Sequence, residues 1–208
     1  MPKLTSQFDF YQNYLLNDVI AFWEKHSIDR QSGGYFNCLN RQGKVYSTDK
    51  YAWMQARQVW MFAKLYNELG HNPHWLAIAR SGAEFLTKHF FNSAGRMYYS
   101  VTREGKPLSA PWHLYSEVFA VIGLAEYAQA VQDDKLLNFV RDLYWRVIKY
   151  STQPEMLGRN PDSARKMTNL SIPMVILNIT QEIRTKIPDS RYPKIIDECI
   201  ATINKHKN

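Results

Sequence analysis

Apolar residues recur every three to four positions along most of the chain, and turn-forming residues interrupt them at intervals. This spacing puts the apolar side chains on one face of a helix, so the pattern predicts an all-α protein. Asn72 followed by Pro73 is typical of a helix N-terminus, Asp133 can cap the helix that follows it, and Pro173 fits a first turn. We expect helices over residues 8–26, 51–69, 73–91, 115–131, 134–150, 170–187 and 192–206.

Two segments between the predicted helices resemble each other. Residues 34–44 and 95–106 both carry an aromatic residue near the start and end in Arg-x-Gly-Lys, with Arg41 and Arg103 lying 62 positions apart. Each copy predicts a short β-hairpin-like excursion with a glycine turn, and the offset leaves room for two helices. A degraded third copy begins near Gly158. Repeated helix pairs predict a solenoid or a ring.

The segment from Lys50 to Trp60 carries the most distinctive pattern in the chain. At helical spacing Lys50, Trp53, Arg57 and Trp60 fall on one stripe, which lines up a guanidinium with two indoles. Large aromatic side chains beside a fixed cation suit a polar, ring-shaped ligand such as a sugar. The alternative is structural, with Trp53 and Trp60 packed in the core while Arg57 caps or bridges a neighbouring helix.

The pattern Trp-x-Gln-x-Arg-Gln-Val-Trp, which starts at Trp53, resembles a helix of the N-acylglucosamine 2-epimerase (renin-binding protein) family. In that family the arginine faces the sugar, and the matching residue here is Arg57. The resemblance implies an (α/α)6 barrel, or αα-toroid, in which six helix pairs close a ring roughly twice the length of this chain. Residues 1–208 would then be a single partial domain, the N-terminal half of the barrel with roughly the first three helix pairs.

Two further segments resemble the same family. Tyr115 and Glu117 lie at the start of a predicted helix, where the resemblance points Tyr115 into the barrel, while Glu117 could instead cap the helix or pair with a base. Asn169 and Met174 lie in a stretch similar to that of the N-acylglucosamine branch, and Met174 would suit an N-acetyl methyl group. The isomerase and cellobiose branches carry a histidine where this chain has Pro173, which argues against them. The candidate substrate-binding residues are Trp53, Arg57, Tyr115, Glu117, Asn169 and Met174.

Epimerisation at carbon 2 removes a proton beside a carbonyl group from one face and returns one to the other, so two acid–base groups must flank that carbon. Histidine suits both roles because its pKa lies near neutral pH. The family takes two histidines from its C-terminal half, and the six histidines of this chain match neither motif. We therefore expect no catalytic residue in this chain, which alone would be incomplete and inactive. One alternative within the chain is a dyad of His113 with Glu117 at i+4.

Charge and composition indicate which kinds of binding partner the chain is expected to lack. The formal net charge is +7, but lysine and arginine are scattered rather than clustered, so we expect no nucleic acid partner. No apolar run is long enough to cross a bilayer and the N-terminus lacks a signal core, which predicts no membrane partner and a cytoplasmic protein. Cys38 and Cys199 form no metal-ligand spacing, so we expect two free thiols and no metal site.

The expected function is the interconversion of N-acetylglucosamine and N-acetylmannosamine, with a small amino sugar as the ligand. The resemblance implies that no cofactor is required, and it suggests ATP as an allosteric activator. Two alternatives stay open: an aldose–ketose isomerase or cellobiose 2-epimerase of the same superfamily, and a non-catalytic helical-repeat binding module. Half a ring would expose apolar helix faces at both edges, so we also expect a homodimer.

Overall fold

The computed structural model describes residues 2–153 and 170–206, and every predicted helix is present within them. The N-terminal helical run starts six residues earlier than predicted, and it comprises α1 (Pro2–Tyr14), a π-helical segment (Leu15–Ile20) and α2 (Ala21–His26). The other helices are α3 (Ala52–Glu68), α4 (Pro73–His89), α5 (Tyr115–Val131), α6 (Asp134–Thr152), α7 (Ser171–Ile183) and α8 (Tyr192–Asn204). The all-α prediction is confirmed.

Two predicted helix caps are also confirmed. The side chain of Asn72 accepts a hydrogen bond from the backbone N–H of His74 at 2.9 Å, and Pro73 is the first residue of α4. The side chain of Asp133 accepts from the backbone N–H of Leu136 at 3.0 Å, just before α6. Each cap satisfies an N–H that has no partner inside the helix, which is why these helices begin where the sequence indicates.

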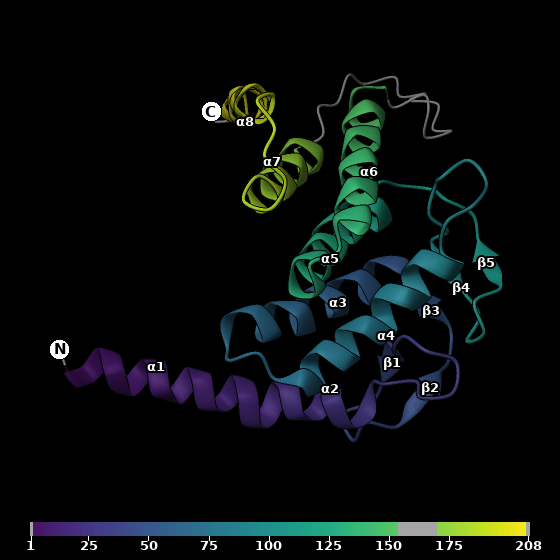
Figure 1. Cartoon of the computed structure of the whole chain (residues 1–208), viewed down its shortest axis with the longest axis vertical. Helices are drawn as coiled ribbons and strands as arrows, with labels where there is room; N and C mark the ends of the chain where they lie inside the picture. Colours follow the sequence, from purple (N-terminus) through teal and green to yellow (C-terminus); the bar gives the residue numbers. More distant parts are fainter. Residues whose placement is uncertain (1, 154–169, 207–208) are drawn as a thin grey trace.

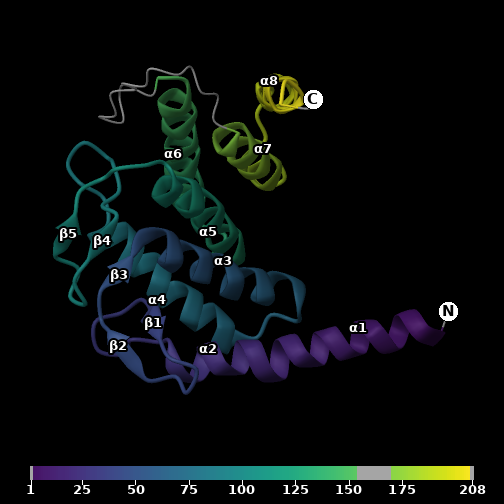
Figure 2. The same cartoon turned by 180° about the vertical axis from the view of Figure 1, so that it is seen from behind.

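Helices α3, α5 and α7 form an inner row, because α3 packs along α5 and α5 contacts α7 (Figure 1). Each inner helix packs against the helix that follows it in sequence, which gives the pairs α3–α4, α5–α6 and α7–α8. Helix α5 lies in the middle and is buried along most of its length. Seen from either side, the helices form an open arc with α1 at one end and α8 at the other (Figure 2).

The close contact between α3 and α5 depends on Gly123. A Cβ at this position would lie 2.4 Å from the carbonyl oxygen of Ala56, and a backbone atom cannot move aside as a flexible side chain can. We expect Gly123→Ala to lower the free energy of unfolding by about 1–3 kcal/mol, measured by urea denaturation. Gln129→Ala, at an exposed position of the same helix, is the control. An unchanged urea midpoint for Gly123→Ala would contradict this packing.

The two repeated segments fold as β-hairpins, as predicted. Antiparallel pairs form between β1 (Cys38–Leu39) and β2 (Val45–Ser47), and between β4 (Ser100–Val101) and β5 (Pro107–Ser109). Strand β3 (Lys50–Tyr51), which directly precedes α3, pairs with β4 and so joins the second hairpin to the first excursion.

The repeat extends beyond the hairpins into the preceding helices. Gly43 and Gly105 occupy corresponding turns with φ angles of 79° and 92°, and a Cβ on either would collide with the ring of His26 or His89. These two histidines end α2 and α4, and each completes the sequence Phe-x-x-Lys-His. Glycine is therefore required both for the turn and for the ring packed against it. The third copy expected near Gly158 lies outside the described residues.

Lys50 does not lie on helix α3, so its predicted place on a helical stripe with Arg57 is wrong. It lies in strand β3 opposite Val101, and its side chain is fully buried. Pairing with β4 keeps the backbone extended up to the residue before Ala52, where the helix begins. The Lys50 ammonium consequently points into the interior, where it donates to Asp29 at 3.0 Å.

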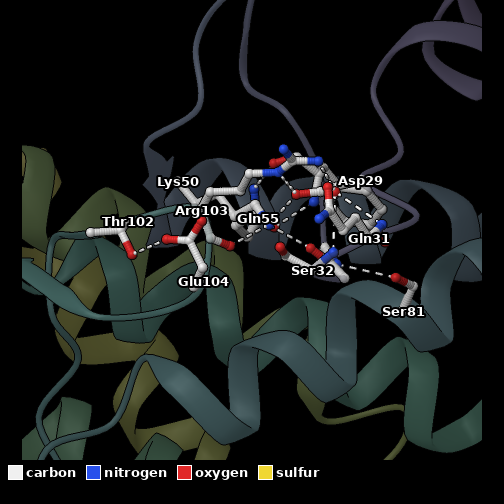
Figure 3. Close-up of polar contacts among 12 residues, drawn as sticks. Asp29, Gln31, Ser32, Lys50, Gln55, Ser81, Thr102, Arg103 and Glu104 are labelled. Atoms are coloured by element: carbon white, nitrogen blue, oxygen red, sulfur yellow. Dashed lines mark hydrogen bonds and ion pairs between the residues drawn. The ribbon is translucent and has the colours of Figure 1, made fainter.

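Asp29, Lys50 and Arg103 form an ion cluster that joins the two excursions, in which the side chains of Asp29 and Lys50 are fully buried and that of Arg103 is 31% exposed (Figure 3). Both carboxylate oxygens of Asp29 accept hydrogen bonds from the Arg103 guanidinium, each at 2.9 Å. Lys50 also donates to the carbonyl oxygens of Gly33 and Arg103. Burial alone would raise the pKa of Asp29, but the hydrogen bonds from Arg103 and Lys50 outweigh it and hold that pKa well below its ordinary value. The cluster thus fixes the two excursions against each other.

Candidate functional site

The long connections of the chain lead into the first turns of the inner helices. Residues 27–51 precede α3 and residues 90–114 precede α5, whereas residues 69–72 and residues 132–133 suffice to join each inner helix to its outer partner. Long loops carried by a rigid scaffold are the usual location of binding groups. The first turns of α3 and α5 are therefore the candidate site.

A cavity of about 310 Å³ lies at this position, and we call it the aromatic cavity. Its lining residues are Trp53, Tyr99, His113, Tyr115 and Phe119, all of them half-buried. The Trp53 and Phe119 rings lie 6.2 Å apart across the contact between α3 and α5. Such a lining offers apolar ring faces with a phenol or imidazole at intervals, which suits a ligand that is both ring-shaped and hydroxylated.

Arg57 stands beside this cavity on α3. Its guanidinium carbon lies 5.3 Å from the centre of the Phe119 ring and 5.7 Å from that of Trp53, so the cation rests on two aromatic residues of the cavity. The side chain is exposed, and it makes no hydrogen bond or ion pair within the described part of the chain. Within the described residues, Arg57 therefore neither caps nor bridges a neighbouring helix, which was the structural alternative. Its N–H donors are available to a ligand.

Trp60 belongs to a neighbouring hollow rather than to the aromatic cavity. This second hollow, of about 290 Å³, is lined by Trp23, Asn37, Met54, Arg57, Gln58, Trp60 and Met61. The indole N–H of Trp60 is buried and has no hydrogen-bond partner among the described residues. Arg57 lines this second hollow and also contacts Trp53 and Phe119 of the aromatic cavity. Trp53 and Trp60, predicted on one stripe, therefore line two different hollows with Arg57 between them.

Tyr115 lines the aromatic cavity, and its contact with substrate stays a prediction. It is the first residue of α5, and its backbone N–H donates to Nδ1 of His113 at 3.2 Å. The His113 ring lies edge-to-face with Tyr115 and with Tyr99, at 5.3 Å in both cases. The imidazole therefore accepts one N–H of the first turn of α5 and also forms part of the cavity wall.

Glu117 does not line the aromatic cavity, and its contact with substrate stays a prediction. Its side chain is only 1% exposed, and one carboxylate oxygen accepts from Nε of Arg96 at 2.7 Å and from the N–H of Met97 at 3.0 Å. This is the pairing with a base that the sequence left open, and burial of the carboxylate requires it. The alternative dyad of Glu117 with His113 is not supported, because Oε1 of Glu117 pairs with Arg96 and Nδ1 of His113 accepts from the N–H of Tyr115.

The two remaining candidates stay apart from the cavity. Met174 lies in the first turn of α7, one residue after Pro173, and its side chain is 52% exposed. It lines neither of the two hollows around Arg57. Asn169 lies outside the described residues. A contact of either residue with substrate stays a prediction.

Tyr99 and Phe119 were not predicted as cavity residues, and His113 was predicted only as an alternative acid–base group. Tyr99 belongs to the second repeated segment, in which an aromatic residue served only to identify the repeat. Phe119 shares a helix face with Tyr115 at i+4, a spacing that could have identified it. His113 lies in the connection before α5, where no periodic pattern predicts which side chain turns inward.

The sequence matches the family profile of the N-acylglucosamine 2-epimerases (GlcNAc 2-epimerase) over residues 34–206. N-acylglucosamine 2-epimerase from Bos taurus is 32% identical over 174 residues, which cover 81% of this chain and 41% of the bovine protein. The Homo sapiens N-acylglucosamine 2-epimerase is 29% identical over 199 residues, which cover 92% of this chain and 47% of the human protein. The chain thus spans about half the length of the curated relatives that it matches.

Solved structures agree on the fold. Cellobiose 2-epimerase from Spirochaeta thermophila DSM 6192 superposes with a TM-score of 0.83 at 20% identity, covering 99% of this chain and 55% of that one. A D-mannose isomerase superposes with a TM-score of 0.78 at 14% identity, covering 93% of this chain and 50% of that one. The helix arc therefore has the fold of about half of an (α/α)6 barrel. Given the profile match and the sequence identity, this chain belongs to the N-acylglucosamine 2-epimerase family.

Proposed function

We propose that this chain supplies one wall of the substrate chamber of a sugar 2-epimerase that interconverts N-acetylglucosamine and N-acetylmannosamine. The observation that carries the proposal is the position of Arg57, a cation held on Trp53 and Phe119 with its N–H groups unused by the described residues. Aromatic faces pack against the apolar side of a sugar, and a guanidinium binds its oxygen atoms. The family relationship supplies the reaction type.

In the proposed reaction the sugar opens to its aldehyde form, and a base removes the proton from carbon 2. The electron pair of the broken C–H bond forms a double bond between carbons 1 and 2, and the carbonyl oxygen becomes an anion. Return of a proton to the opposite face restores the carbonyl with carbon 2 inverted. No electron is gained or lost overall, so the proposal requires no cofactor. Arg57 is suited to hold the oxygen on which charge develops, a contact that is stronger in the transition state than in the ground state.

We place the proton-transfer groups outside this chain. Within the described residues, Nδ1 of His113 accepts from a backbone N–H and Oε1 of Glu117 accepts from Arg96, which supports structural roles for both side chains. The resemblance locates two histidines in the second half of the barrel. The 208-residue chain by itself is therefore proposed to be inactive, while the closed ring would be an isomerase-class enzyme.

A turnover assay tests this function. Joining this chain to the C-terminal half of the bovine N-acylglucosamine 2-epimerase gives what we call the ring-complete protein. It should convert N-acetylmannosamine, followed by NMR of the C1 protons, and should act more slowly on mannose and cellobiose. Conversion of mannose or cellobiose alone would favour the isomerase or cellobiose 2-epimerase alternative. Sugar binding without any turnover would favour the binding module.

We further propose that the chain forms a homodimer through apolar surface at the N-terminal end of the arc. Helix α1 and the segment after it expose Phe8, Phe10, Tyr11, Tyr14 and Leu15. Exposed aromatic residues at this density on one helix mark an interaction surface. Sedimentation velocity should show a dimer that Phe8→Glu with Tyr11→Glu converts to monomer. A monomer at all concentrations would contradict the proposal.

The proposed location is the cytoplasm. Among the described helices, none has the length and apolar character needed to cross a membrane. The proposed ligand, a small amino sugar, enters the chamber from solution.

A further inference from the structure

The two excursions are attached to the inner helices by equivalent side chains. Gln55 in α3 and Glu117 in α5 are both buried, and they lie 62 positions apart, the same offset as between Arg-x-Gly-Lys segments. Oε1 of Gln55 accepts from the N–H of Tyr35 at 2.9 Å, and Oε1 of Glu117 accepts from the N–H of Met97 at 3.0 Å. Tyr35 and Met97 differ by the same offset. Each inner helix therefore holds its excursion through one side-chain oxygen.

The first copy shows that this attachment needs no charge. Nε2 of Gln55 donates to the carbonyl oxygen of Tyr35 at 2.7 Å, so one amide satisfies both backbone groups of that residue. The second copy uses the Glu117 carboxylate, which needs a partner once it is buried, and Arg96 donates to it at 2.7 Å. Gly34 corresponds to Arg96 in the first copy, where a Cβ would lie 2.6 Å from Oε1 of Gln55. The ion pair is thus specific to the second copy, and attachment alone does not account for it.

Arg96 connects the two ends of the second excursion. Its side chain is only 10% exposed, and its guanidinium carbon lies 4.9 Å from the centre of the Tyr150 ring. Nη2 of Arg96 donates to the carbonyl oxygen of His113 at 3.5 Å, across the excursion from its own backbone. Tyr99 follows Arg96 by three residues, Tyr115 follows His113 by two, and both tyrosines line the aromatic cavity. The ion pair therefore ties together the two segments that carry these rings to the cavity.

We propose that Glu117 is a positioning residue of the proposed reaction, which acts through Arg96 to set the separation of Tyr99 and Tyr115. This inference rests on the proposed function, because the sugar is expected to pack on these rings. Rings that are held in place in advance bind a ligand without being ordered by it. Loss of the ion pair should weaken binding of the ground state and the transition state alike, which raises KM and leaves kcat almost unchanged.

Steady-state kinetics of the ring-complete protein on N-acetylmannosamine test this role. The neutral-pair variant, Arg96→Met with Glu117→Gln, removes both charges and keeps an oxygen for the Met97 N–H, as Gln55 does in the first copy. Neutral groups of similar size often replace a buried ion pair with little effect on stability. We expect KM to rise about 10-fold and kcat to stay within about twofold of the original value.

A second buried ion pair on the same helix gives the matched control. Glu126 of α5 is 1% exposed, as Glu117 is, and it pairs with Lys186 at 3.0 Å. Neither residue lines the aromatic cavity. Glu126→Gln with Lys186→Met should therefore leave KM unchanged. An equal rise of KM in this control would overturn the inference, because charge loss anywhere on α5 would then have the same effect.

KM distinguishes positioning from a merely structural role. A partly unfolded enzyme has fewer active sites, so its kcat falls while its KM stays the same. An unchanged KM in the neutral-pair variant would overturn the inference, whatever the value of kcat. If that variant does not fold, Arg96→Lys replaces it, because lysine keeps a charge for Glu117 but lacks the fork that also reaches the His113 carbonyl. Its KM should rise about threefold, and a wild-type KM would overturn the inference.

A measurement without sugar separates this inference from the proposed function. NMR of ring-labelled tyrosines in the 208-residue chain should show shifted signals of Tyr99 and Tyr115 in the neutral-pair variant, with assignments from Tyr99→Phe and Tyr115→Phe. The signal of Tyr35, attached to Gln55 in the first copy, should not move. Unchanged signals of Tyr99 and Tyr115 would overturn the inference. A ring-complete protein that converts no sugar would refute the proposed function instead, and the NMR result would still report on Glu117.

Discussion

Asp29→Asn should lower the free energy of unfolding by about 3–5 kcal/mol, the largest stability effect that we expect from a single substitution. The variant is close in shape to the wild type, but it leaves the fully buried ammonium of Lys50 without a counter-charge. Burial already lowers the pKa of Lys50 although Asp29 acts in the opposite direction, so the ammonium is incompletely compensated even in the wild type. Arg103 would lose a two-oxygen contact as well.

Urea denaturation at pH 7 measures this effect, with Asp9→Asn as the control because Asp9 is an exposed carboxylate on α1. Replacing Asp29 by leucine together with Lys50 by methionine removes both buried charges and should recover much of the lost stability. A loss below about 1 kcal/mol for Asp29→Asn, the range of an exposed pair, would show that the cluster is not buried as described.

The same cluster predicts a pH dependence. The pKa of Asp29 is held well below the ordinary value of about 3.9, so its ionised form stabilises the folded chain at every pH above that value. This contribution is lost as the pH falls below about 4 toward the lowered pKa of the folded state. The difference in stability between the wild type and Asp29→Asn should therefore shrink from pH 4 downward and stay constant between pH 5 and 7. A constant difference down to pH 2 would contradict the lowered pKa.

Arg57→Ala in the ring-complete protein should lower kcat/KM by about 100- to 1,000-fold, the largest catalytic effect that we expect from this chain. The guanidinium is proposed to bind the oxygen that becomes negative, so most of the loss should appear in kcat. Because Arg57 is exposed and bonds no described residue, the urea midpoint should hardly change.

Two variants make the Arg57 experiment specific. Arg57→Lys keeps the charge but loses the planar fork, and we expect it to recover only part of the activity. Arg30→Ala removes an exposed cation elsewhere and should be neutral. Full activity of Arg57→Ala would assign Arg57 a structural role, and a large fall in the urea midpoint would do the same.

Local patterns predicted the helices and their caps because those features depend on residues a few positions apart. The three-to-four-residue spacing of apolar side chains predicted the position of each helix. Asn72 and Asp133 cap α4 and α6, as expected of asparagine and aspartate before a helix. The repeated Arg-x-Gly-Lys segments predicted the two hairpins for the same reason. The matching Phe-x-x-Lys-His ends of α2 and α4 are a further local signal of the same repeat.

The errors concern side chains whose position depends on distant partners. Lys50 lies in strand β3 and not on the predicted helical stripe, because β3 pairs with β4 and the Lys50 ammonium donates to Asp29. Glu117 turned away from the cavity to reach Arg96, 21 positions earlier in the chain. No spacing rule indicates either pairing. The position of Tyr99 in the candidate site also depends on distant partners, because the folding of the second excursion brings its side chain to the cavity.

Deuterium incorporation at carbon 2 of N-acetylmannosamine in D₂O tests the central claim most directly, which is that this chain binds the sugar while proton transfer comes from the other half of the barrel. Every round of deprotonation and return replaces the C2 proton with deuterium, so NMR detects proton transfer even without net conversion. We predict incorporation by the ring-complete protein and none by the 208-residue chain alone. Incorporation by the chain alone, or its absence in the ring-complete protein, would contradict the claim.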